Sequence, residues 1–163
     1  MHLIDFLKEN EIPFTQKDDG SLHVHEHLYL YGTFTRLPEN LSRLEVDGDL
    51  YVSSDTERLP DFLRVKGDLD LCGNTIITRL PDNLSIGGSL DISGCTNITQ
   101  LPENLSIGRV FSWGGSGIQC RSEFPDSMEI GGCRAVLRSY KMEKQLLDAL
   151  SVDSGKSNLT PSP

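Results

Sequence analysis

Several features are scarce in this sequence of 163 residues, and each scarcity excludes a class of protein. No run approaches the roughly 18 consecutive apolar residues that a membrane-spanning helix needs. The first five residues, MHLID, include a histidine and an aspartate where a signal peptide has an apolar stretch. We therefore expect no export by that route, no membrane association and a cytoplasmic location.

Cysteine is also scarce, and the four cysteines form no C-x-x-C pair: Cys72, Cys95, Cys120 and Cys133. In a cytoplasmic chain this pattern predicts reduced structural thiols rather than a disulfide framework. A catalytic cysteine needs a histidine and an acid beside it, and the sequence positions neither. No glycine-rich phosphate loop is present either. We therefore predict a protein that is not an enzyme and that carries no cofactor.

Basic residues are outnumbered by acidic ones, 15 to 24, which gives a net charge of -9. Phosphate contacts require Lys and Arg, so direct binding to nucleic acid is not expected. The acidity is concentrated, because residues 37–104 hold 12 acidic and 5 basic side chains. This distribution indicates a protein partner with a basic surface.

What the sequence does contain is a repeat, marked by Leu-Pro pairs that begin at Leu37, Leu59, Leu80 and Leu101. The spacings are 22, 21 and 21 residues, and the clearest unit reads LPDNLSIGGSLDISGCTNITQ. Each unit holds an alternating apolar pair that predicts a short strand, a glycine before it and a Leu-Pro turn after it. A single unit cannot bury its own apolar face, so the units must stack into a solenoid of mostly short parallel strands.

The segment from Leu69, LDLCGNTIITRLPDNL, resembles a leucine-rich repeat, and the Leu-Pro pair makes it similar to the LPX type of bacterial effectors. The resemblance covers the repeats only, roughly residues 20 to 132. It implies that Asn74 and Cys95 form a ladder of polar side chains inside the coil. The ubiquitin-ligase activity of some LPX effectors belongs to a separate catalytic domain, so we do not expect it here.

The repeats depart from that family in one spacing. The apolar residue expected three positions before the strand leucine stands four before it, at Val46, Val65, Ile86 and Ile107. This indicates a wider coil with a second short strand in each unit.

The two ends of the chain have helical patterns that predict caps for the stack. We expect a helical cap over residues 1–19, the leucine-rich-repeat-like solenoid over 20–137, a capping helix over 138–151 and a disordered tail over 152–163.

The strand residues between the core leucines point outward and form the candidate binding face. The predicted partner-binding residues are Tyr29, Tyr31, Asp49, Tyr51, Asp68, Asp70 and Asp91. We expect a protein-interaction module, an inhibitor or effector that binds a bacterial host or defence protein, with the chain acting for a phage or mobile element. The alternative on the same evidence is a solvated acidic face that only keeps the sheet soluble.

Two further functions stay open. An acidic rod of this kind can act as a nucleic-acid mimic that occupies a DNA-binding channel. His23, His25 and His27 alternate along the chain and can ligate a metal if they share one strand face. We predict no metal site, because His25 and Glu26 fall at the bend that glycine fills in other units.

Overall fold

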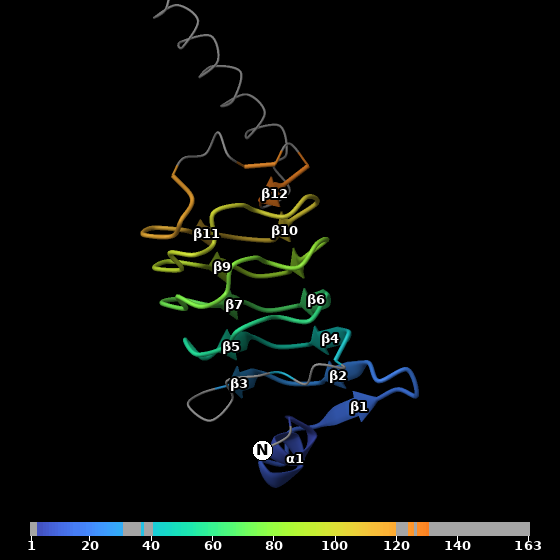
Figure 1. Ribbon diagram of the computed structural model, residues 1–163. Coiled ribbons are helices and arrows are strands. Elements are labelled where there is room, and N and C mark those ends of the chain that lie inside the picture. Colours follow the sequence, from blue (N-terminus) through green and yellow to red (C-terminus); the bar gives the residue numbers. More distant parts are fainter. Residues whose placement is uncertain (1–2, 31–36, 38–40, 120–123, 126, 131–163) are drawn as a thin grey trace, which may run out of the picture.

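The described part of the chain forms a stack of five coils, and each of these coils contributes one strand to each of two sheets (Figure 1). The computed structural model describes residues 3–30, 37, 41–119, 124–125 and 127–130. Its strands are two to four residues long, and all strands that join one coil to the next pair in parallel. The predicted repeat solenoid of short parallel strands is therefore confirmed.

Sheet A runs in the order β1-β2-β4-β6-β8-β10-β12, and sheet B in the order β11-β9-β7-β5-β3. The strands of sheet A are β1 (Phe14–Gln16), β2 (Leu22–Val24), β4 (Arg43–Val46), β6 (Phe62–Val65), β8 (Ser85–Ile86), β10 (Ser106–Ile107) and β12 (Glu129–Ile130). The strands of sheet B are β3 (Leu28–Leu30), β5 (Leu50–Val52), β7 (Leu69–Asp70), β9 (Leu90–Asp91) and β11 (Phe111–Ser112).

The unusual spacing of the repeats is explained by the second sheet. Val46, Val65, Ile86 and Ile107 each end a strand of sheet A and are buried. Three residues then turn the corner before the strand of sheet B begins, and its first residue is again buried. A longer segment, which contains the Leu-Pro pair, returns the chain to sheet A. The core is the space between the two sheets and this return segment.

The N-terminal end of the stack is covered by α1 (Leu3–Glu9) and by β1. Leu3 and Leu7 lie four residues apart on one helix face, and both are buried against the core. β1, which lies within the cap that the sequence predicted to be helical, pairs antiparallel with β2. The expected helix over 138–151 and the expected disordered tail over 152–163 lie outside the described residues.

At the other end of the described stack, aromatic residues replace the aliphatic ladder. Phe111 is buried, and its ring lies 5.2 Å from that of Trp113 and 5.4 Å from that of Phe124.

Among the described residues, no helix has the length and apolar composition needed to cross a bilayer.

Candidate functional site

The corner between the two sheets is built on a column of polar side chains that each hold the next coil. The backbone N–H of Asp49 donates to Nδ1 of His27 at 2.9 Å. The N–H of Asp68 then donates to Oδ1 of Asp49 at 2.7 Å, and the N–H of Ser89 to Oδ1 of Asp68 at 2.7 Å. We call these four residues the corner column. Two predicted binding residues, Asp49 and Asp68, thus satisfy backbone groups of the neighbouring coil.

The corner column explains two glycines of the repeat, Gly67 and Gly88. A Cβ on Gly67 would lie 2.1 Å from Oδ1 of Asp49, and a Cβ on Gly88 would lie 2.1 Å from Oδ1 of Asp68. Glycine is therefore required where an aspartate of the preceding coil reaches across. Ser89 ends the column with a shorter side chain, and at this position the next coil carries Arg109 instead of glycine.

The outward side of sheet B carries one continuous row of side chains. Tyr29 pairs with Tyr51 in the register, Tyr51 with Asp70, Asp70 with Asp91 and Asp91 with Ser112. The rings of Tyr29 and Tyr51 stack with their centroids 4.9 Å apart, and Tyr29 remains 43% exposed. We call these five residues the sheet B row. The structure thus aligns four of the predicted binding residues, while Tyr31 lies outside the described residues.

The two aspartates of this row each accept one local hydrogen bond. Oδ1 of Asp70 accepts the N–H of Cys72 at 2.8 Å, and Oδ1 of Asp91 accepts the N–H of Ser93 at 2.7 Å, so each carboxylate closes a turn at the end of its strand. Partial desolvation raises the pKa of Tyr51, and the charge of Asp49 adds to this, so the phenol stays protonated. An open hollow of about 460 Å³ adjoins the row and is lined in part by Tyr51 and Asp70.

Asn74 and Cys95 both lie inside the coils, fully buried. The Asn74 amide donates to the carbonyls of Ser53 and Thr56 at 3.0 and 2.9 Å, and its Oδ1 accepts the N–H groups of Ile76 and Ile77 at 2.9 and 2.8 Å. The Cys95 thiol donates to the carbonyl of Leu71 at 3.0 Å, and burial raises its pKa to about 11. These contacts hold the return segments of neighbouring coils together.

The three histidines do not share one face. His23 Nε2 lies 2.9 Å from Oδ1 of Asp47, and His25 Nδ1 lies 3.5 Å from Oδ2 of the same carboxylate. His27 lies beyond the bend, in the corner column, with its ring 6.1 Å from that of Tyr29. The bend divides the three histidines as the sequence indicated, and an aspartate lies where a third histidine would be needed.

The Asp47 carboxylate contacts side chains of both neighbouring coils, Lys66 on one and His23 on the other. The Lys66 ammonium lies 2.7 Å from Oδ1 of Asp47, and this contact, followed by the bond to His23, holds the pKa of the Asp47 carboxyl well below its ordinary value. Sequence reasoning missed this cluster. A signal was present, because His25, Asp47 and Lys66 each follow the last buried residue of a strand in successive coils.

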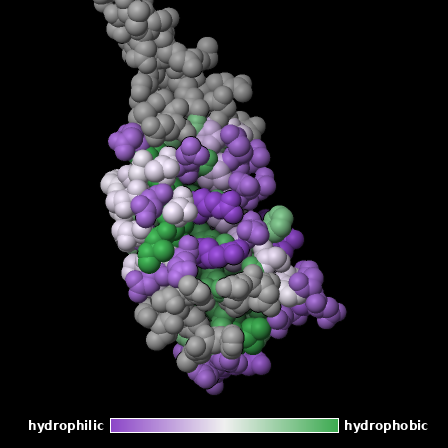
Figure 2. All heavy atoms as spheres, in the orientation of Figure 1, coloured by the Kyte–Doolittle hydropathy of each residue, from purple (hydrophilic) through white to green (hydrophobic). Residues whose placement is uncertain are grey.

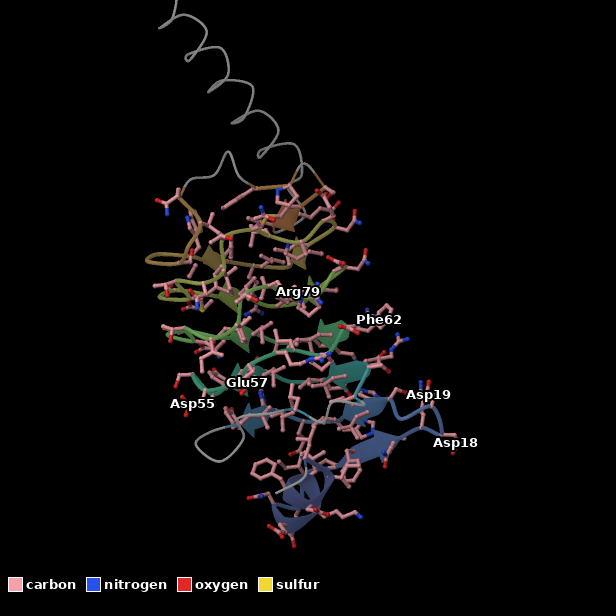
Figure 3. The ribbon with its side chains drawn as sticks, viewed as in Figure 1. Asp18, Asp19, Asp55, Glu57, Phe62 and Arg79 are labelled. Carbon is pink, nitrogen blue, oxygen red and sulfur yellow. The ribbon has the colours of Figure 1, made fainter. Side chains whose placement is uncertain are left out.

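The return segments form a third surface, where hydrophilic and hydrophobic residues intermix (Figure 2). An open hollow of about 500 Å³ here is lined by residues that include Glu57, Phe62 and Arg79. Figure 3 shows Glu57 and Arg79 between the two columns of strands, and Phe62 on the side of sheet A. The lining of this hollow mixes Arg58 and Arg79 with acidic side chains, so the hollow favours neither an anionic nor a cationic ligand.

The fold defines the protein as a parallel β-solenoid in which each coil contributes one strand to each of two sheets. No family model, no curated protein and no solved structure matches the chain. The likeness to leucine-rich repeats thus remains a likeness of sequence motifs.

Proposed function

We propose that the protein is a non-enzymatic protein-interaction module that binds a basic partner through the sheet B row. The observation that carries this proposal is the row itself, in which two stacked tyrosines continue in register into two aspartates. The row that faces outward on sheet A differs, because there His23 is followed by Glu45, Arg64 and Ser85. Of these two rows, the one on sheet B joins aromatic surface to charge of a single sign.

The charge of Asp70 and Asp91 goes beyond what the fold needs. Each carboxylate closes a turn through one oxygen, and an asparagine closes the same turn without a charge. The two residues are also direct neighbours across a parallel pair, about 4.8 Å apart, where like charges destabilise a sheet. A role in binding explains why a charge stands at both positions.

The chemistry of the row indicates the kind of partner. The stacked rings of Tyr29 and Tyr51 form an aromatic surface against which the apolar stem of an Arg or Lys side chain can pack, and the adjacent carboxylates can pair with its charge. Aromatic side chains on a rigid sheet lose little freedom on binding, which favours them as anchors. The partner class that we propose is a basic protein surface, such as that of a bacterial host or defence protein.

The test compares the wild-type chain with the double variant Asp70→Asn, Asp91→Asn, which keeps both turns and removes both charges. Proteins captured from a bacterial lysate are identified, and their affinity for each variant is measured. We expect the double variant to weaken the complex by roughly 5- to 30-fold, for about 1–2 kcal/mol of lost pairing. The charge-matched control is Asp18→Asn, Asp82→Asn, at two exposed positions away from sheet B.

Unchanged affinity in the Asp70 and Asp91 variant would show that the acidity of the row only keeps the sheet soluble. An equal loss in the control would show that the charge acts without regard to position, and the sheet B row would not be the interface. Duplex DNA separates the interaction module from a nucleic-acid mimic. A mimic occupies a DNA channel, so DNA displaces it, whereas an interface anchored by Tyr51 is lost in Tyr51→Ala and persists when DNA is added.

A further inference from the structure

A second site lies where the first two strands of the stack in sheet A, β2 and β4, end, and it is separate from the sheet B row. It combines His23 on β2 and His25, which directly follows β2, with Asp47, which directly follows β4 in the adjacent coil. The nitrogen and oxygen atoms that these three residues offer all lie within 4.8 Å of one another. The three side chains are 26–39% exposed, so the cluster is open to an ion from solvent.

The donor set and its spacing fit a first-row transition metal. Zn²⁺ takes imidazole nitrogen and carboxylate oxygen at about 2.0–2.2 Å, which in a tetrahedron places ligand atoms roughly 3.4 Å apart. His25 Nδ1 already lies 3.5 Å from Oδ2 of Asp47. His23 Nε2 lies 2.9 Å from the other oxygen of this carboxylate, Oδ1, so a rotation of the exposed Asp47 carboxylate and a small shift of the His23 ring are needed to bring both nitrogens to such a spacing from one oxygen.

The surroundings of His25 also have the form of a metal site. Metal-bound histidines commonly use their second ring nitrogen for a hydrogen bond that fixes the ring. Oγ1 of Thr15 on β1 lies 2.8 Å from Nε2 of His25, which leaves Nδ1 turned toward Asp47. Three strands, β1, β2 and β4, thus position the cluster, and they belong to one hydrogen-bonded sheet.

A cation already sits at the carboxylate. The Lys66 ammonium lies 2.7 Å from Oδ1 of Asp47, on the next coil, with 63% of its side chain exposed. A long and exposed lysine can swing away at little cost, and its charge would repel a metal dication bound beside it. The lysine and the metal therefore compete for Asp47.

We propose that His23, His25 and Asp47 form a Zn²⁺ site with one coordination position left for water or a partner's side chain, and that Lys66 is displaced when the metal binds. The sequence predicted no metal site here, and the alternative that it left open used His27, whose place in this cluster is taken by Asp47. It is independent of the sheet B row, so its success or failure leaves the proposed function untouched.

The test is calorimetric titration of the untagged full chain with Zn²⁺ in metal-free buffer. His23→Gln and His25→Gln should each weaken binding by more than the roughly tenfold to hundredfold loss typical of removing an outer-shell partner. His27→Gln is the matched control and should bind Zn²⁺ as the wild type does. Far-UV circular dichroism checks that each variant keeps the fold.

Lys66→Met gives an independent arm that removes no ligand. Without the competing ammonium, Zn²⁺ affinity should rise, by roughly fivefold or more if one screened charge pair is removed. The double variant His23→Gln, His25→Gln keeps every other histidine and cysteine of the chain. Zn²⁺ binding that is as tight in this double variant as in the wild type, or an equal loss in His27→Gln, overturns the proposal, as does unchanged or weaker binding in Lys66→Met.

Discussion

The substitution Gly67→Ala probes the corner column at the point where the structure leaves no space. The new Cβ would lie 2.1 Å from Oδ1 of Asp49, and also 2.7 Å from the carbonyl carbon of Gly48 and 2.8 Å from the nitrogen of Asp49. The carboxylate can rotate away, but it then loses its bond to the N–H of Asp68. The backbone atoms can move only by separating the two coils.

The expected cost follows from these two effects. A hydrogen bond to a charged group contributes about 1.5–3 kcal/mol, and forcing an extra carbon into packed structure costs about 1–3 kcal/mol. Replacing glycine by alanine returns about 0.4–1 kcal/mol, because the unfolded chain loses freedom. Gly67→Ala should therefore lower the free energy of unfolding by roughly 2–5 kcal/mol, measured by urea denaturation.

Gly114→Ala is the matched control, because a Cβ there meets nothing within 4 Å. It should leave stability unchanged or raise it slightly. Asp49→Ala in the Gly67→Ala background completes the cycle. The loss of unfolding free energy in the double variant should be smaller than the sum of the losses in Gly67→Ala and Asp49→Ala by about 1.5–3 kcal/mol, since both substitutions remove the same hydrogen bond. A cost for Gly67→Ala no greater than that of Gly114→Ala, or full additivity with Asp49→Ala, would refute this account of the glycines.

Three other predictions concern buried or paired groups. Asn74→Ala should cost roughly 3–5 kcal/mol in urea denaturation, because it removes all four hydrogen bonds of a fully buried side chain; a loss below about 1 kcal/mol would contradict this role. Brief alkylation at about pH 8 followed by peptide mapping should label exposed Cys72 and spare Cys95, whose burial raises its pKa to about 11; equal labelling would exclude that burial. The lowered pKa of Asp47 means that its stabilisation is present above about pH 4 and is lost as the pH falls through the folded value, so Asp47→Asn should lose less stability than the wild type between about pH 5 and pH 2.5; parallel pH profiles would contradict it.

The repeated pattern made the fold predictable. The buried ends of the strands in sheet A, such as Val65, stand four residues before the first core residue of sheet B, Leu69, and that spacing predicted the second strand. β1 was not predictable, because its three residues Phe14–Gln16 are half-buried or exposed and show no apolar alternation.

The candidate site was predictable only where side chains follow from alternation along a strand. Tyr51 and Asp70 are neighbours in the sheet B row because both lie one residue after a buried leucine. The bonds of Asp49 depend on how closely two coils approach at a corner, which no pattern within one repeat reveals. The meeting of His23 with Asp47 likewise joins residues 24 positions apart through the register of β2 and β4.

The most direct test of the proposed interaction face is site-specific photo-crosslinking. Benzoylphenylalanine replaces Tyr51 in one variant and Phe62 in another, so that each exchange substitutes one aromatic side chain for another. Tyr51 lies on sheet B, whereas Phe62 lies on sheet A and is 59% exposed, which makes it the more accessible of the two. The account predicts that a captured partner crosslinks at position 51 and not at position 62. Crosslinking at position 62 alone, or equally at both, would contradict it.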